Sequence, residues 1–255
     1  MKILVLVKQV PDTATKIRVN AGDTVIQTDG VKWVINPYDE FAIEECLRLR
    51  ERFGGEVVVL TLGPKRVEEA IRQALAMGAD RAIHLDSDRE LDSQAAARVL
   101  ARACQDEGFD LIMTGKQAVD DDQAQVGPLV AVELGLPQVT VVLTLEVDPE
   151  ARRIRAEREL EGASEWVSLP MPAVITAQRG LNEPRYPTLP NIMKAKKKEV
   201  KVIAVESLGV PLDPWVRVEA FSLPPERPAG KILTGDPVEV AQELARLLHE
   251  EAKVI

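Results

Sequence analysis

The sequence predicts an α/β protein built on a doubly wound parallel sheet. Its first half alternates short β-branched and leucine-rich runs, which are typical of buried strands, with stretches that have the apolar spacing of helices. This alternation is characteristic of a parallel sheet with helices on both faces. The chain has 255 residues, 45% of them hydrophobic, which is enough for a core in one large or two small domains.

The elements of this sheet come first in the chain. We expect its strands at residues 2–8, 56–62, 81–85 and 111–113. We expect helices with one apolar face between them, at residues 38–53, 67–77 and 93–107. Asn36 precedes Pro37 and is predicted to cap the first of these helices. Before it, residues 25–29 and 31–35 are predicted to be short strands around a turn at Gly30.

The second half of the chain has a different pattern. Residues 139–147 and 153–160 alternate around Asp148-Pro149, which predicts an antiparallel hairpin. Further strands are expected at residues 166–169, 173–177 and 199–204. A final helix begins at Asp236, which is placed to cap it, and its apolar face packs either on its own domain or on a partner. We therefore divide the chain into an α/β domain, residues 1–205, and a linker with a C-terminal helix, residues 206–255.

Composition excludes several classes of function. The net charge of −9 argues against binding to nucleic acid or to an anionic membrane, and no apolar run is long enough to insert into a membrane. Cys46 and Cys104 lack metal-ligand spacing and are expected to be reduced core residues of a cytoplasmic protein. The sequence has no P-loop, no dinucleotide glycine fingerprint and no nucleophile elbow.

The stretch FDLIMTGKQAVDDDQAQVGP, residues 109–128, is the best candidate for a binding site. Gly115 follows a strand, so a ligand could approach the backbone there, and Lys116 and Gln117 could add donors. A phosphate-bearing ligand such as a nucleotide fits this pattern, but so does an ordinary strand–loop–helix turn with an acidic patch. The three aspartates at residues 120–122 favour a solvated loop over a metal site, because adjacent carboxylates point in different directions.

Residues 181–198 form a second unusual segment. Pro184, Pro187 and Pro190 predict a long surface loop without regular helix or central strand. Three apolar side chains in it could be offered to a partner, or they could fold back onto the body of the protein, which the residues alone favour. These side chains are Leu189, Ile192 and Met193.

Four stretches together resemble one known family. GKQAVDDDQAQVGP, NPYDEFAIEE, ALAMGADRAIHL and LNEPRYPTLPNIMKAKKK are similar to segments of the electron transfer flavoprotein β subunit, and the resemblance covers nearly the whole chain. It implies an adenine-nucleotide-hydrolase-like α/β fold and a heterodimer whose α subunit carries the redox-active FAD. It also implies that the β subunit does no bond chemistry of its own and holds an AMP.

The resemblance implies specific site residues. The AMP site would consist of Leu6, Asn36, Pro37, Tyr38, Asp39, Leu62, Gly115, Lys116, Gln117, Ala118, Val119, Asp120, Asp121, Asp122, Gln123, Ala124, Gln125 and Val126. The proline-rich segment would be a recognition loop in which Leu189 anchors acyl-CoA dehydrogenases, and Glu159 would contact the α subunit. The other residues of the recognition loop would be Arg185, Tyr186, Pro190, Ile192 and Met193.

The resemblance further implies a pathway for electrons, from acyl-CoA dehydrogenases through FAD to a membrane quinone oxidoreductase. The C-terminal helix would complete the flavin domain of α, and Lys194 and Lys197 match positions that are methylated in animal members. In electron-bifurcating members, by contrast, a second FAD replaces AMP, and the AQVGP sequence resembles theirs. We favour AMP, because an inward-pointing Asp121 carboxylate would repel a diphosphate. An adenylating enzyme and a stand-alone nucleotide sensor remain as alternatives from other classes.

Overall fold

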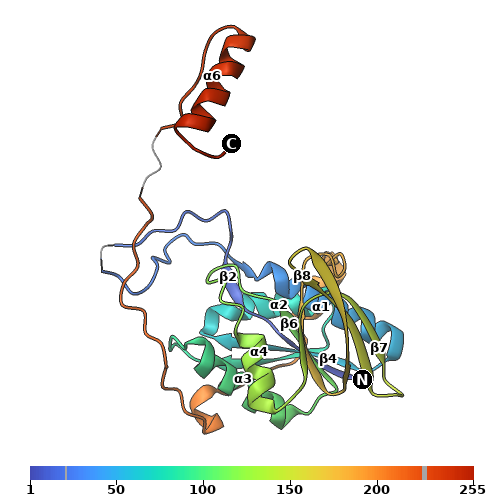
Figure 1. Ribbon diagram of the computed structural model, residues 1–255. Helices are drawn as coiled ribbons and strands as arrows, with labels where there is room; N and C mark the ends of the chain where they lie inside the picture. The colour runs from blue at the N-terminus through green and yellow to red at the C-terminus, as the bar shows by residue number, and fades with distance from the viewer. Residues whose placement is uncertain (21, 226–228) are drawn as a thin grey trace.

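The computed structural model describes residues 1–20, 22–225 and 229–255 and has the predicted α/β architecture (Figure 1). Its main strands are β1 (Lys2–Leu6), β4 (Glu56–Gly63), β5 (Arg81–Asp86), β6 (Leu111–Gly115), β7 (Gln138–Asp148), β8 (Arg153–Leu160), β9 (Ala163–Pro170), β10 (Ala173–Ala177) and β11 (Val200–Ala204). Within the described residues these nine strands form one sheet in the order β11-β5-β4-β1-β6-β10-β7-β8-β9. All neighbours from β11 to β7 are parallel, whereas β8 and β9 are antiparallel additions.

Helices cover both faces of the parallel part of the sheet. Helices α1 (Pro37–Phe53) and α2 (Glu68–Met77) lie on one face, and α3 (Ser93–Glu107) and α4 (Val126–Leu134) lie on the other (Figure 1). Short 3-10 helices, Lys65–Val67 and Val205–Leu208, precede α2 and follow β11. The predicted doubly wound sheet is confirmed.

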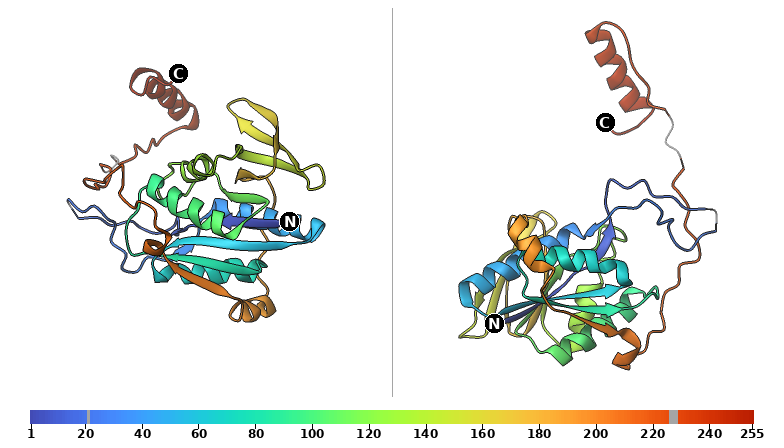
Figure 2. Two further views of the ribbon diagram at one scale, coloured as in Figure 1. Left: turned by 90° about the horizontal axis from the view of Figure 1, so that it is seen from below. Right: turned by 180° about the vertical axis from the view of Figure 1, so that it is seen from behind.

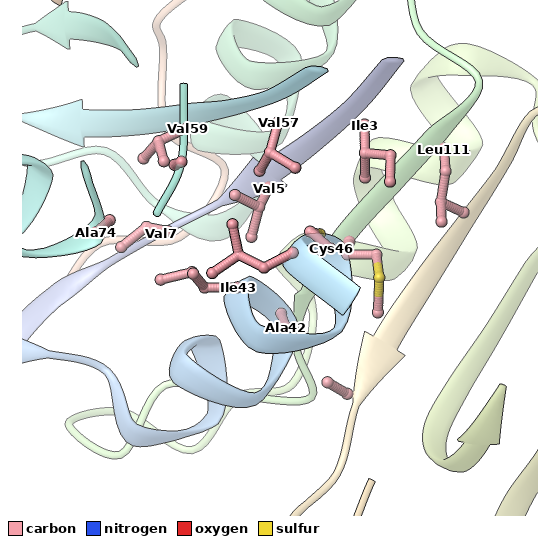
Figure 3. Packing of buried hydrophobic residues seen from close by; sticks show 14 of the residues in the cluster. Ile3, Val5, Val7, Ala42, Ile43, Cys46, Val57, Val59, Ala74 and Leu111 are labelled. Atoms are coloured by element: carbon pink, nitrogen blue, oxygen red, sulfur yellow. The ribbon is translucent and has the colours of Figure 1, made fainter. Parts of the chain in front are cut away.

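The two helical layers explain why the central strands carry apolar side chains on both faces. Successive side chains of a strand point to opposite faces, so Ile3 and Val5 of β1 pack toward α1 and α2, while Leu4 and Leu6 pack toward α3 and α4. Figure 3 shows the first of these cores, where Val5 lies close to Ile43 of α1. Cys46 and Cys104 are buried, one in each core, and are free thiols, as expected.

The predicted hairpin is confirmed as β7 and β8, and a bulge in β7 turns it out of the parallel sheet (Figure 2). Val141 has a φ of 61°, which is rare for a β-branched residue, and its N–H donates to Thr176 Oγ1 at 2.9 Å. The register of β7 against β10 shifts across Val141, and its register against β8 shifts just beyond, between Val142 and Thr144. A bulge bends its strand, so β7 leaves β10 after Val142 and continues paired antiparallel with β8.

The predicted strand pair around Gly30 is wrong. Only Trp33–Ile35 is a strand, β3, and it pairs with β2 (Gln9–Pro11). Residues 26–28 are irregular and Val25 is 45% exposed, so this stretch has no buried face to hold a strand. The short β3 is stabilised instead by a tertiary contact, because the Arg66 guanidinium stacks over the Trp33 ring at 4.0 Å.

The expectation of a loop without regular helix over residues 181–198 is also wrong, because Leu189–Ala195 forms a helix, α5. Pro190 lies in the first turn, where the N–H that proline lacks has no partner within the helix. Thr188 caps the helix by accepting a hydrogen bond from the Asn191 N–H at 3.4 Å. The prolines therefore start this helix rather than prevent it.

The C-terminal segment runs over the body and then leaves it. Asp92 caps α3 through one carboxylate oxygen, and its other oxygen accepts from the N–H groups of Trp215 and Val216 at 2.7 and 3.0 Å. Beyond this point the final helix, α6 (Pro237–Glu250), stands away from the sheet (Figures 1 and 2). Asp236 caps α6, as predicted, by accepting from the Val238 N–H. Among the described residues, no helix is long and apolar enough to cross a membrane.

Candidate functional site

The candidate nucleotide site lies where the chain order of the parallel strands reverses. After β1 the chain adds β4 and β5 on one side, then returns to add β6 on the other side of β1. The loops after β1 and β6 therefore leave in opposite directions and open a crevice at the carboxyl ends of the strands, which is where open α/β sheets bind ligands. The predicted residues of the stretch 115–126, the start of α1, Leu6 and Leu62 all lie at this edge.

Asp39, in the first turn of α1, joins the two central strands. Its carboxylate is 3% exposed, and its two oxygens accept from the N–H groups of Lys8 and Gly115, each at 2.8 Å. One side chain thereby fixes the backbone directly after β1 and at the end of β6.

Asn36 is the N-cap residue of α1, as predicted, but its side chain makes no capping hydrogen bond. Its amide instead crosses to the loop after β6: Nδ2 donates to the Gln117 carbonyl at 2.8 Å, and Oδ1 accepts from the Val119 N–H at 3.2 Å. A buried amide has to satisfy both its donor and its acceptor, and here the loop supplies a partner for each. Asn36 thus holds the candidate binding loop against the start of α1.

Two glycines allow close approach at this edge. A Cβ on Gly115 would lie 2.5 Å from Asp39 Oδ1 and 2.6 Å from Tyr38 Cβ, closer than atoms can pack. A Cβ on Gly127, in the first turn of α4, would lie 2.9 Å from the Cγ2 atoms of both Thr114 and Thr176. The first glycine seats α1 against β6, and the second seats α4 against β6 and β10.

Lys8 neutralises part of the acidic run. Its ammonium group pairs with Asp120 at 2.8 Å and with Asp121 at 3.0 Å. Burial lowers the pKa of Lys8, but the two carboxylates raise it more, so the net shift is upward. Within the described residues, no group of three or more His, Cys, Asp or Glu side chains is arranged to hold a metal ion.

The loop between β6 and α4 has an unusual backbone. Asp122 and Ala124 have φ values of 51° and 53°, a region that non-glycine residues rarely adopt and that marks loops with a functional constraint. Left-handed residues in a turn can direct neighbouring N–H groups to one side, which suits an anion. Gln125 makes no side-chain cap on α4 and the first turn of α4 has no acidic residue, so the helix N-terminus keeps N–H donors for a phosphate.

The other predicted residues of this site surround the same loop. Lys116 lies over the Tyr38 ring, 5.0 Å from its centre, and is only partly exposed. Gln117 donates to Asp122 at 2.5 Å, and Gln123 accepts from Ser93 at 2.9 Å. The residues present therefore fit a nucleotide whose phosphate meets backbone N–H groups at the start of α4.

The second predicted surface is the apolar side of the 181–198 segment. Tyr186 is 94% exposed, Leu189 79%, Met193 63% and Ile192 41%. We call these four side chains the α5 face. The expectation that Leu189, Ile192 and Met193 fold back onto the body is therefore wrong, because α5 directs them to solvent while only Ala195 is buried.

Two further predicted partner residues, Arg185 and Glu159, form bonds within the chain. Arg185 pairs with Glu44 and Glu51 of α1. Glu159, on β8, accepts from the Gln178 amide at 2.5 Å.

The comparisons with known proteins agree on one family. The electron transfer flavoprotein domain family matches residues 23–208. The chain is 42% identical to "Electron transfer flavoprotein subunit beta" of Bacillus subtilis, with all of both chains covered. It is 44% identical to the subunit of that name in Homo sapiens, over all of this chain and 99% of the human one. It is also 44% identical, over all of both chains, to "Electron transfer flavoprotein subunit beta, mitochondrial" of Oryza sativa subsp. japonica.

The chain is an electron transfer flavoprotein β subunit. Membership of this family places it in an electron carrier and implies an α subunit as its partner. Lys8 and Gly127 were not singled out by sequence reasoning, although both lie in the candidate site as the structure builds it.

The buried carboxylate of Asp39 predicts a pH dependence of stability. Burial raises its pKa to about 7 from 3.8, while hydrogen bonds from Lys8, Asn36 and Gly115 and the charge of Lys8 oppose the rise. Between pH 3.8 and pH 7 the folded state binds more protons at Asp39 than the unfolded state does. The contribution of Asp39 to the free energy of unfolding therefore falls as the pH rises toward 7 and stays constant above it.

We expect Asp39→Asn, which cannot titrate, to remove this dependence. The unfolding free energy of the wild type minus that of the variant should be about 3 kcal/mol larger at pH 5 than at pH 8. Urea unfolding of both proteins across this pH range measures the difference, in which the other titrating groups cancel. A difference that does not change with pH would contradict the assignment.

Proposed function

We propose that this β subunit holds AMP at the carboxyl ends of β1, β4 and β6 and forms a heterodimer with an α subunit that carries FAD. The observation that carries the AMP assignment is the loop after β6. It is held at a close-approach glycine by Asp39 and Asn36, and it leads into an α4 N-terminus with free N–H donors. A nucleotide monophosphate would place its phosphate there, where the helix dipole and backbone donors favour negative charge.

In this proposal, the heterodimer carries electrons from acyl-CoA dehydrogenases to a membrane quinone oxidoreductase. The dehydrogenases dock on the α5 face, with Leu189 as the central anchor, because exposed apolar side chains on a rigid helix are suited to fill a partner's pocket. Electron transfer itself takes place at the FAD, whereas this chain binds AMP, pairs with the α subunit and recognises the dehydrogenases.

The C-terminal residues 206–255 are proposed to pack on the α subunit. Two features support this: α6 stands away from its own sheet, and the arm that leads to it exposes large apolar side chains. Trp215 is 75% exposed and Val216 70%, although Asp92 fixes the backbone of both residues. Glu159, near the end of β8, is proposed to face the α subunit as well.

A second FAD in place of AMP is the alternative, and the charge of the loop argues against it. Three aspartates stand at residues 120–122, and within the contacts described one ammonium group, that of Lys8, pairs with two of them. The loop therefore keeps a negative balance, which repels a diphosphate more strongly than a monophosphate.

Nucleotide analysis separates the two possibilities. The complex would be co-purified with its α subunit and denatured, and the released nucleotides would be quantified by chromatography with absorbance. We expect one FAD and one AMP per heterodimer. Two FAD and no AMP would overturn the AMP assignment and require the site after β6 to be read as a flavin site.

A further inference from the structure

The α5 face needs a support, because its own helix is too short to be stable alone. Helix α5 has 7 residues, and isolated helices below about 12–15 residues are marginal in water. Of its side chains, only Ala195 is buried, so the core contributes little to holding it. Helix α5 packs against α2, and the side-chain hydrogen bonds that fix the segment lie at its two ends.

The support at the N-terminal end is Arg185. Its Nε donates to Glu44 Oε2 at 2.8 Å and its Nη2 donates to Glu44 Oε1 at 2.9 Å, so that the guanidinium and the carboxylate meet in a two-bond fork. Its backbone N–H also donates to Glu44, at 3.1 Å, and its Nη1 pairs with Glu51. Next to it, Asn182 donates to Glu45 at 3.1 Å and to the Phe41 carbonyl at 3.0 Å.

Glu44 makes this contact specific to Arg185. It is only 5% exposed, and a buried carboxylate without a partner is costly, so the guanidinium is required at this place on α1. Lysine could supply the charge there but not the planar fork.

The restraint at Arg185 reaches the α5 face through a short and stiff connection. Only three residues separate Arg185 from Leu189, and one of them is Pro187. Pro184 precedes the arginine and Pro190 lies in the first turn of α5. Proline restricts the backbone, so fixing Arg185 limits the positions open to Tyr186 and Leu189.

The C-terminal end is supported on α2. Arg72 Nη1 donates to the carbonyls of Ala195 and Lys198, each at 2.9 Å. Lys198 Nζ in turn donates to the carbonyls of Leu75, at 3.0 Å, and Ala79. The segment is thus bound to α1 at one end and to α2 at the other, with the α5 face between them.

We propose that Arg185 is a positioning residue, which holds the α5 face in the conformation that a partner enzyme binds by pairing with Glu44 and Glu51 of α1. This inference rests on the proposed docking function of that face. It assigns Arg185 a role within the chain instead of a direct contact with the partner. Nε, Nη1 and Nη2 all donate to carboxylates of α1, so a partner could engage the guanidinium fully only by breaking those pairs.

The first test measures the conformation and does not depend on function. Arg185→Ala would be prepared in complex with the α subunit, and amide hydrogen exchange would be followed by mass spectrometry. We expect exchange over residues 186–195 to become at least about 10-fold faster, with the peptides of the sheet unchanged. Arg52→Ala is the matched control, because it removes an exposed positive charge from α1 beside Glu51 without touching the segment. Unchanged exchange over residues 186–195 would overturn the proposal.

The second test measures docking. Flavin reduction in the complex would be followed against the concentration of a reduced acyl-CoA dehydrogenase. We expect Arg185→Ala to raise the apparent KM about 10-fold with kcat close to wild type, because loss of preorganisation weakens binding without altering the flavin. Reduction by dithionite, which needs no docking, should be unaffected. Arg185→Lys should recover part of the lost affinity.

A double variant separates positioning from a general loss of structure. If Arg185 acts by placing Leu189, then Arg185→Ala should add little to the KM of Leu189→Ala, so that the two effects do not multiply. Multiplying effects, or faster exchange with an unchanged KM, would overturn the positioning role. If Leu189→Ala alone leaves KM unchanged, the docking function has failed. Should Arg185→Ala unfold the complex, Arg185→Lys gives the same comparisons with the charge beside Glu44 retained.

Discussion

Gly115→Ala should destabilise the protein by about 3 kcal/mol and abolish retention of the nucleotide. The added methyl group would lie 2.5 Å from Asp39 Oδ1 and 2.7 Å from the Tyr38 backbone carbon. Because one of these neighbours is backbone and the other is a buried carboxylate held by two hydrogen bonds, neither can move without breaking the junction of α1 with β1 and β6. The start of α1 and the loop after β6 would be forced apart.

Thermal unfolding and the AMP content of the purified complex measure both effects. Gly230→Ala is the matched control: no atom lies within 4 Å of a Cβ at that position, and its backbone needs no glycine. A Gly115→Ala complex that unfolds like wild type and still releases one AMP would show that the close contact does not form part of the site.

Leu189→Ala should raise the apparent KM for an acyl-CoA dehydrogenase about 30-fold while leaving kcat and the FAD content unchanged. A central apolar anchor typically contributes about 2 kcal/mol to an interface, which corresponds to that change in affinity. Leu189 is 79% exposed, so its truncation leaves no cavity in the free protein and should not alter folding.

The control for this result is a substitution of another exposed apolar residue, away from the α5 face. Val202, on the edge strand β11, is 60% exposed, and Val202→Ala should leave the kinetics as they are. Stopped-flow reduction of the flavin at several dehydrogenase concentrations distinguishes KM from kcat. Identical kinetics for Leu189→Ala and wild type would rule out the anchor role.

The parallel sheet was predictable because its signal is local. A strand covered on both faces has to be apolar on both faces, so unbroken apolar runs such as residues 3–7 and 57–60 stand out in the sequence. Strand β2 was missed and β3 was displaced, because a strand of three residues is too short to show an alternating pattern. The contact that stabilises β3 is also not local: Trp33 packs against Arg66, which follows β4 in the chain. Helix α5 was missed because a proline starts a helix when it lies in the first turn and prevents one when it lies in the interior. The cap at Thr188 places Pro190 in the first turn.

The candidate site was predictable to a similar extent. Its loops could be placed, since loops after parallel strands meet at one edge of the sheet. The bonds that shape it could not, because Lys8 and Asp120 are 112 positions apart in the chain and nothing local indicates that they pair. The same holds for Arg185 and Glu44, which are 141 positions apart.

Helix α1 contacts both the candidate nucleotide site and the segment that carries the α5 face. Asn36 and Asp39 at its start bind the loop of the nucleotide site, and Glu44 and Glu51 further along bind the segment that carries the α5 face. This 17-residue helix is about 25 Å long and is in direct contact with both segments. If AMP and the electron donor bind at the two places proposed above, any coupling between them has to be reciprocal: whatever AMP adds to the affinity for the donor, the donor adds to the affinity for AMP.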